Sequence, residues 1–307
     1  MTRTELTKFM KTIKEKLIGN ELAEGTANLY ITKLRKLNGD KDFHTFTFLK
    51  DTQAIKEKIE GLENKNTKKS YITSIVSVLN VMGIKQYTKI NVVYKAYLND
   101  QKEYFNTLDQ SKKSETQKEN WIEWEDVIKK YDSLEEEAKK LTSEDMGTTK
   151  NRNIMNEYMI LSFYVLSPPR RNADYYLMKL TNDNHSDNDY NYYDSKDNKF
   201  YFNKFKTSKY GKESFSVNDR LKKVLKFYNN VMEIKNGDYI LFKNDEKRTS
   251  SSIMTKTLNK IFGKKVGASM LRHIYLSAKY GKVEKEMDKD AEMMSHSKQE
   301  QSNYIKN

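Results

Sequence analysis

The sequence predicts a mostly α-helical protein of two domains, the second of which also holds a small antiparallel sheet. Three observations support this fold class. Apolar residues recur at helical spacing over most of the 307 residues. One stretch, residues 109–120, contains no apolar residue and separates the helices into two groups. Between residues 191 and 217, aromatic and polar residues alternate, as they do in short strands.

The first domain, residues 1–108, is predicted to be entirely helical. Its apolar pattern indicates five helices, at residues 4–18, 25–39, 51–62, 66–83 and 88–108. Thr26 is the expected N-cap of the second helix, and Gly39 its stop. The fourth helix is expected to begin near Asn66 and to end at Gly83. Short connections between these helices predict a compact all-α domain.

The second domain, residues 121–307, follows the polar linker 109–120. It opens with helical patterns at 121–131 and 153–167, the second of which is stopped by Pro168 and Pro169. A short helix comes next, with apolar residues running to Leu180. Two or three antiparallel strands are expected before residue 218, after which helices resume at residues 219–233, 250–263, 269–280, 284–294 and 297–305.

The composition narrows the possible functions. The chain carries 56 Lys and Arg against 43 Asp and Glu, a net charge of +13, which favours a polyanionic partner such as nucleic acid. A lysine excess also follows from nucleotide bias in a genome, so charge alone decides little. The absence of cysteine excludes disulfides, thiolate metal sites and cysteine nucleophiles. An intracellular location fits the absence of cysteine, and because no apolar stretch approaches the length of a membrane helix, no membrane partner is expected.

Two basic segments of the second domain are candidates for binding an anion. In "PPRRNADYYLMKL", Arg170 and Arg171 stand at the start of a helix, where Asp174 could fix Arg171 by an i,i+3 pair. In "KFKTSKYGK", a turn between two strands presents Lys204, Lys206 and Lys209. Each segment alone has an ordinary interpretation, as a surface ion pair and as a solvated turn.

A third segment, "SMLRHIYLSA", places Arg272 inside a run that otherwise reads as a buried helix. Met270, Leu271, Ile274, Tyr275 and Ala278 are expected to face a core. Burying an unpaired charge costs several kcal/mol, so Arg272 needs either a protein partner or an anion from outside. His296 and Tyr304 follow in "MMSHSKQEQSNYIKN", and either residue alone near a terminus would be unremarkable.

The ordered set of these residues resembles the tyrosine recombinase/integrase family, whose catalytic fold is shared with type IB topoisomerases. "RNAD" is similar to the family's R-x-x-E motif, with Asp174 in place of Glu. "SMLRHIYLSA" resembles its H-x-L-R-H box, and "MMSHSKQEQSNYIK" its box of a histidine followed by the nucleophilic tyrosine. Residues 22–38 resemble a helix of the family's N-terminal core-binding domain. The resemblance therefore covers both domains.

The resemblance implies an N-terminal SAM-like core-binding domain and a C-terminal α+β catalytic domain that close on double-stranded DNA. It assigns catalysis to Arg171, Lys206, Ser269, Arg272, His296 and Tyr304. Two guanidiniums would bind the scissile phosphate, Tyr304 would form a 3′-phosphotyrosyl link, and Lys206 would protonate the leaving oxygen. Further DNA contacts are expected from Arg170, Lys204, Lys209, Lys68 and Lys69. No metal, ATP or other cofactor is expected, and "NDNHSDND" around His185 is interpreted as a solvated loop.

Three departures from the family pattern keep alternatives open. Ser269 stands where the family has His or Lys, and the interval from His296 to Tyr304 is one residue shorter than the commonest one. Few residues follow Tyr304, so a tetramer on paired sites would need surfaces other than a C-terminal exchange helix. The expected function is site-specific recombination, such as the integration of a virus or mobile element. The alternatives are a topoisomerase-like relaxing enzyme and a DNA-binding regulator that has lost catalysis.

Overall fold

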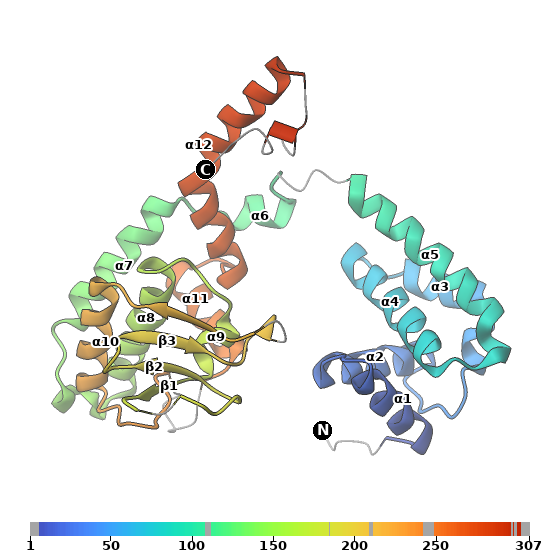
Figure 1. The fold of residues 1–307 in the computed structure, drawn as a ribbon, viewed down its shortest axis with the longest axis horizontal. Coiled ribbons are helices and arrows are strands. Elements are labelled where there is room, and N and C mark those ends of the chain that lie inside the picture. Colours follow the sequence, from blue (N-terminus) through green and yellow to red (C-terminus); the bar gives the residue numbers. More distant parts are fainter. Residues whose placement is uncertain are drawn as a thin grey trace. The chain divides into compact units, whose positions relative to one another are not determined.

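The computed structural model describes residues 6–107, 112–183, 185–208, 211–241, 249–295, 297 and 300–301. Within these ranges the chain is mostly helical and contains one four-stranded sheet (Figure 1). It divides into two compact units, unit 1 (residues 1–112) and unit 2 (residues 113–307), which are described separately. None of the helices described is at once long enough and apolar enough to cross a bilayer.

Unit 1 is built around a central helix. Its helices are α1 (Lys8–Gly19), α2 (Glu24–Leu37), α3 (Thr52–Glu60), α4 (Lys65–Met82) and α5 (Thr88–Thr107), with short 3-10 turns at Thr47–Leu49 and Lys85–Tyr87. On α4, Ile72, Ile75 and Val78 are fully buried, because apolar residues at this spacing share one face of a helix. This apolar face packs against α1, α2 and α5.

The ends of α2 and α4 differ from the sequence prediction at their first residues. α2 begins after Ala23, so Thr26 lies within its first turn and is not the N-cap. On α4 the N-cap is Asn64, whose side chain accepts a hydrogen bond from the backbone of Thr67 at 3.0 Å, and not Asn66. The predicted stop of α4 is confirmed, since Gly83 takes a left-handed conformation with φ of 60°.

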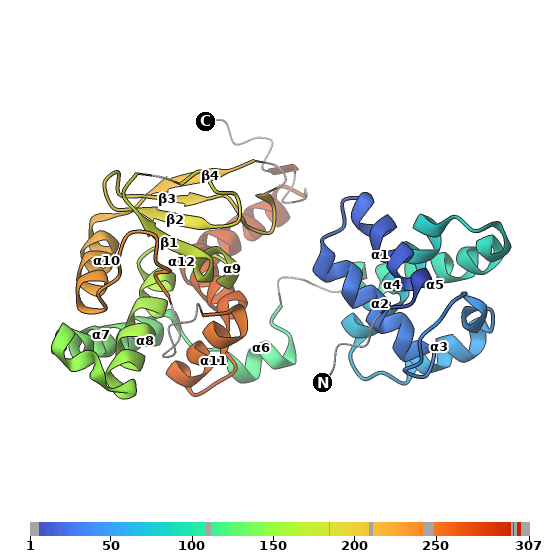
Figure 2. The same cartoon turned by 90° about the horizontal axis from the view of Figure 1, so that it is seen from below.

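Unit 2 combines helices with a small sheet. Its helices are α6 (Glu115–Asn120), α7 (Trp124–Ala138), α8 (Thr149–Val165), α9 (Asn172–Tyr176), α10 (Asp219–Val231), α11 (Ser251–Phe262) and α12 (Ala268–Met293), with a 3-10 turn at Ser143–Gly147. Its strands are β1 (Met178–Thr181), β2 (Asn191–Asp194), β3 (Lys199–Phe202) and β4 (Glu213–Ser216). Figure 2 shows the sheet as a layer over α8 and α9.

The sheet has four strands, whereas the sequence predicts two or three, and it is mixed where the sequence predicts an antiparallel sheet. Its order is β1-β2-β3-β4, with β1 and β2 parallel and the other two pairings antiparallel. β1 contains Met178 and Leu180, which the sequence pattern places in the preceding helix. Aromatic rings join the sheet to the helices, since Phe163 of α8 stacks on Tyr175 at 4.3 Å and contacts Phe200 of β3 at 6.1 Å.

Two further boundaries correct the sequence prediction. Residues 115–120 of the predicted linker form α6, whose N-cap Ser114 and Gln117 make a reciprocal capping box. The two helices predicted at 269–280 and 284–294 are one continuous helix, α12. On α12, Ala278 is exposed, whereas the sequence pattern assigns it to the core. Of the helix predicted at 297–305, the described residues include a helical Glu300 and Gln301, and the rest lies outside them.

Candidate functional site

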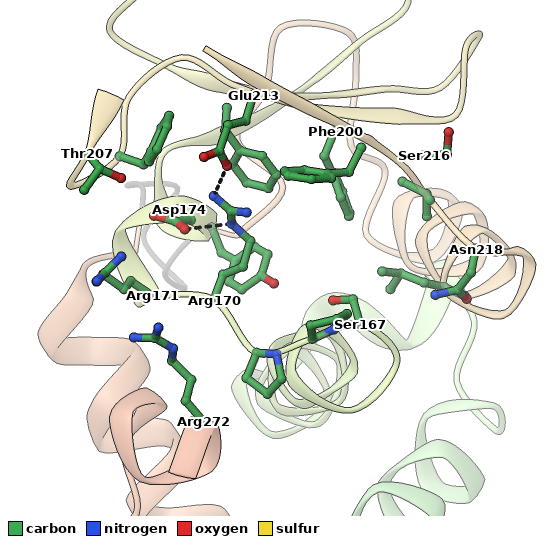
Figure 3. A pocket seen from close by; sticks show the side chains of 18 residues that line it. Ser167, Arg170, Arg171, Asp174, Phe200, Thr207, Glu213, Ser216, Asn218 and Arg272 are labelled. Atoms are coloured by element: carbon green, nitrogen blue, oxygen red, sulfur yellow. Dashed lines mark hydrogen bonds and ion pairs between the residues drawn. The ribbon is translucent and has the colours of Figure 1, made fainter. Parts of the chain in front are cut away.

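A pocket of about 540 Å³ lies in unit 2 between the sheet and the helices beneath it (Figure 3). Its walls come from the segment after α8, from α9, from β3 and β4, from the start of α10, and from α12. Both arginines that the sequence singles out, Arg171 and Arg272, line this pocket. The fold thus brings together two cations that are about 100 positions apart in the chain.

The helix starts explain how the two guanidiniums come to face one pocket. Arg171 is the N-cap residue of α9, so its side chain leaves the chain just where the helix begins. Arg272 lies on α12 between Leu271 and Ile274, which are 0% and 1% exposed. Figure 3 shows both guanidiniums on the same side of the pocket, with the Arg272 side chain pointing toward Arg171. Arg272 therefore leaves the apolar face of its helix and enters the pocket, which agrees with an anion as its partner.

Arg170, the neighbour of Arg171, is held inside the protein. Its Nε donates to Asp174 Oδ2 at 2.8 Å, and its Nη2 donates to Glu213 Oε2 at 2.9 Å. Its guanidinium also lies over the ring of Phe202, 4.0 Å from the ring centre. The i,i+3 pair predicted between Arg171 and Asp174 is wrong, because Asp174 pairs at i,i+4 with Arg170. Because α9 begins at Asn172, Asp174 pairs with Arg170, and Arg171 instead lines the pocket.

Charge and burial oppose each other at this ion pair. Burial raises the pKa of Asp174 above its ordinary value, and the Arg170 and Arg171 guanidiniums offset this rise only in part. Burial alone would lower the pKa of Arg170, but Asp174 and Glu213 outweigh it and the net shift is upward. Asp174 Oδ1 is buried without a hydrogen-bond partner. The carboxylate of Asp174 therefore depends on Arg170 for its stability in the charged form.

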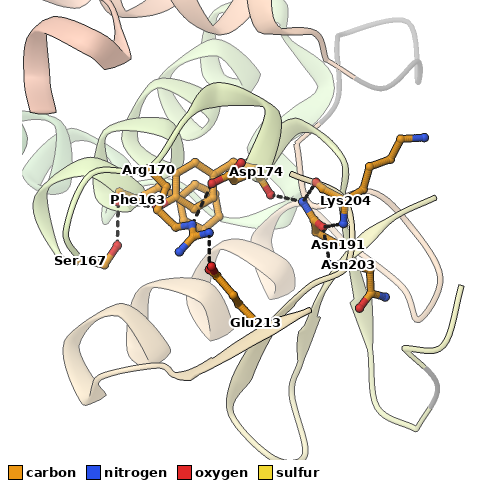
Figure 4. A network of polar contacts seen from close by, with 9 residues as sticks. Phe163, Ser167, Arg170, Asp174, Asn191, Asn203, Lys204 and Glu213 are labelled. Carbon is orange, nitrogen blue, oxygen red and sulfur yellow. Dashed lines mark hydrogen bonds and ion pairs between the residues drawn. The ribbon is translucent and has the colours of Figure 1, made fainter. Parts of the chain in front are cut away.

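Two buried amides hold α9 in place. Asn191, which is 0% exposed, donates from Nδ2 to the carbonyls of Asp174 and Lys204 at 2.8 and 3.0 Å (Figure 4). Its Oδ1 accepts from the backbone of Asn203 and Lys204 at 3.0 and 2.8 Å. Asn172 in turn donates to the Ser251 carbonyl of α11 at 2.9 Å. The segment that carries the pocket arginines is thus tied to both the sheet and α11.

Three of the other predicted site residues lie outside the pocket lining. Lys206 is exposed and directly precedes Thr207, which lines the pocket. Ser269 is exposed on the first turn of α12. Lys204 forms an ion pair with Asp189 at 2.6 Å, and in Figure 4 its side chain points away from Arg170. His296, Tyr304 and Lys209 lie outside the described residues.

The tyrosines near the two arginines differ in their suitability as nucleophiles. Tyr175 lines the pocket but is 1% exposed, and burial raises its pKa to about 12, which disfavours the phenolate. Tyr275 packs edge-on against Trp124 at 5.3 Å, and Lys279 donates to its hydroxyl at 3.3 Å. Tyr280 is half exposed and does not line the pocket. None of these described tyrosines is arranged to attack a phosphate in the pocket.

The predicted DNA contacts of unit 1 have partners within the protein. Lys68 forms an ion pair with Glu60 at 2.8 Å, and Lys69 lies 4.5 Å from the ring centre of Phe105. Hydrogen bonds from Lys68 and then from Tyr97 hold the pKa of Glu60 below its ordinary value. Both lysines therefore already interact with side chains of unit 1.

Over the part of the chain that the structure describes, no three His, Cys, Asp or Glu residues are grouped so that they could hold a metal ion. His185 of the acidic loop instead stacks on Tyr201, with ring centres 3.7 Å apart.

Several residues of the site could not be recognised from the sequence. Glu213 reaches Arg170 from a strand 43 positions away, and no local pattern indicates this pair. Asn172 and Asn191 look like ordinary loop and strand amides until their partners are known. Tyr175 was expected only as an apolar residue of its helix. Only the ion pair of Asp174 could be anticipated from the sequence, and it was predicted with Arg171 instead of Arg170.

No protein-family model matches the chain, and neither does any curated protein or solved structure. The arrangement of residues therefore carries the functional argument alone.

Proposed function

We propose that the chain is a site-specific DNA recombinase of the tyrosine recombinase/integrase type, acting on double-stranded DNA inside a cell. Unit 1 would be the core-binding domain and unit 2 the catalytic domain. The observation that carries the proposal is the meeting of Arg171 and Arg272 in one pocket. Guanidiniums stay protonated at any working pH and bind two phosphate oxygens at once, which suits them to a phosphodiester.

The proposed reaction is a phosphoryl transfer without a metal. The oxygen of Tyr304 attacks phosphorus after its proton passes to solvent, and the bond from phosphorus to the 5′ oxygen breaks. The charge that develops on the non-bridging oxygens is stabilised by Arg171 and Arg272. Lys206 donates a proton to the departing 5′ oxygen, and His296 donates a hydrogen bond to the phosphate. The ester keeps the bond energy, so rejoining needs no ATP.

The test is a search for the covalent intermediate. The protein is incubated with nicked suicide duplexes that carry a randomised sequence on the scissile side, so that cleavage releases a short fragment and traps the adduct. We expect a band on a denaturing gel that contains both protein and DNA, and its loss in Tyr304→Phe with DNA binding retained. Tyr275→Phe and Tyr280→Phe are matched controls, because neither residue lines the pocket.

The outcome distinguishes the alternatives. An adduct that survives Tyr304→Phe and disappears in one of the control variants would refute the choice of nucleophile. An adduct accompanied by relaxation of plasmids without a partner site would indicate a topoisomerase-like enzyme.

A DNA-binding regulator with the same fold is a second candidate. It is favoured by the positions of Ser269 and Lys206, which are exposed and do not line the pocket. A serine hydroxyl is also a poorer proton acceptor than an imidazole or an amine. This candidate predicts DNA binding that depends on Arg171 and Arg272 without any covalent adduct.

A further inference from the structure

The second half of α12 carries an apolar stripe, most of which is open to solvent in the described chain. Leu276, Tyr280 and Val283 are 50%, 49% and 53% exposed, and the partly buried Met287 continues the spacing. From Leu276 to Met287 the intervals are four, three and four residues, the spacing of a coiled-coil seam. The residues of α12 that are buried among those described are Leu271, Ile274 and Ala291, all outside this stretch.

The stripe lies C-terminal to the part of α12 that packs against the rest of unit 2. Its N-terminal part is fixed by Leu271 and Ile274 in the core and by the contact of Tyr275 with Trp124. Beyond this part the helix extends from the rest of unit 2 (Figure 1). An amphipathic helix that presents coiled-coil spacing to solvent is suited to pairing with another helix.

We propose that this stripe is a self-association surface, on which α12 of a second copy of the chain packs in the antiparallel direction. An antiparallel pair centred between Gly281 and Lys282 places Leu276 against Met287 of the second copy and Tyr280 against its Val283. The stripe is thereby complementary to itself, as a two-fold interface requires. The same apolar residues form both halves of the seam.

The charges beside the stripe select the second copy and its direction. In the antiparallel pair, Asp290 meets His273 of the second copy, whose imidazole can donate to a carboxylate, and Lys279 lies near its Glu286. In a parallel pair, Asp290 would face Asp290 within the seam, which opposes association. The inference does not depend on the proposed function, since pairing and DNA cleavage are measured separately.

The first test is the molar mass of the full chain in solution. Light scattering is expected to give twice the chain mass of 36.3 kDa at micromolar concentrations. Val283→Glu is expected to give the monomer, because it places a carboxylate in the seam. Val92→Glu is the matched control, since Val92 is 62% exposed on α5 and lies outside the stripe, and it should stay dimeric.

The second test determines the direction of pairing. Because the chain has no cysteine, Tyr280→Cys and Val283→Cys chains can be mixed and oxidised without competing thiols. Antiparallel pairing predicts a disulfide between the two different chains as the main product. Products linking identical chains would overturn the antiparallel arrangement.

Two other results would overturn the proposal as a whole. One is a wild-type chain that remains monomeric throughout the micromolar range. The other is a Val283→Glu chain that still forms the dimer. Leu276→Gln is a milder change that controls for the possibility that Val283→Glu disturbs folding. It should weaken the dimer at least about tenfold and leave the thermal unfolding of unit 2, followed by tryptophan fluorescence, unchanged.

Discussion

Removing the guanidinium of Arg170 is expected to destabilise unit 2 far more than neutralising Glu213, its partly exposed carboxylate partner. Arg170→Ala leaves Asp174, whose side chain is 3% exposed, as a buried carboxylate without its ion-pair partner. Breaking a buried pair in this way typically costs about 3–5 kcal/mol. Glu213→Gln should cost only about 0–1 kcal/mol, because the Glu213 side chain is 40% exposed and screened by solvent.

The assay is urea unfolding followed by tryptophan fluorescence. Both tryptophans of the chain, Trp121 and Trp124, belong to unit 2, so the signal reports this unit alone. The double variant Arg170→Ala/Asp174→Asn is expected to regain part of the lost stability, because it removes the buried charge. Equal losses for Arg170→Ala and Glu213→Gln, or no recovery in the double variant, would refute the reasoning.

The pH dependence of Arg170→Ala provides an independent check. Burial already raises the pKa of Asp174, and loss of Arg170 raises it further. The variant's carboxyl is therefore protonated more readily in the folded chain than in the unfolded chain. Its stability deficit should shrink as the pH falls from neutrality through that raised pKa, and this trend should be absent in Arg170→Ala/Asp174→Asn.

Three further predictions follow from the same structure. Arg272→Lys keeps the charge but loses the bidentate geometry, so covalent adduct formation should fall by about 10²–10³-fold with the urea midpoint of unit 2 unchanged. Asn191→Ala leaves four backbone groups without their side-chain partner and should cost unit 2 about 3 kcal/mol or more, measured by tryptophan fluorescence in urea. Because the pKa of Glu60 is lowered in the folded chain, its carboxylate stabilises unit 1 at pH values above the ordinary pKa of 4.5, and this contribution is lost as the pH falls through the lowered pKa. Glu60→Gln should remove this part of the acid sensitivity of unit 1, measured as unfolding by circular dichroism at decreasing pH.

The sequence predicts the helices of unit 1 well because their apolar residues repeat over several turns. It fails at β1, where Met178 and Leu180 lie in a strand of four residues. An apolar run this short fits either a strand or a helix end, and only its pairing with β2 decides. The break predicted within α12 is also absent. A single Gly281 costs a helix only about 1 kcal/mol relative to alanine, which is too little to end it.

In the site too, residues in a distinctive local segment can be recognised from the sequence, whereas residues whose partners are distant in the chain cannot. Arg171 and Arg272 were recognised because each stands in a distinctive local segment, and both line the pocket. The partner of Asp174 could not be recognised, because the sequence allows pairs at both i,i+3 and i,i+4 as long as the first residue of α9 is unknown. Glu213 and Asn191 act across the sheet, and long-range contacts of this kind leave no spacing to read.

The central claim is that Arg171 and Arg272 act on one phosphate, and a double-mutant cycle on adduct formation tests it most directly. The rates are measured for the wild type, Arg171→Ala, Arg272→Ala and the double variant with the same suicide duplex. If both guanidiniums hold the same phosphate, the double variant should lose little more than the worse single variant. Losses that multiply independently, or a single variant that keeps the wild-type rate, would contradict the claim.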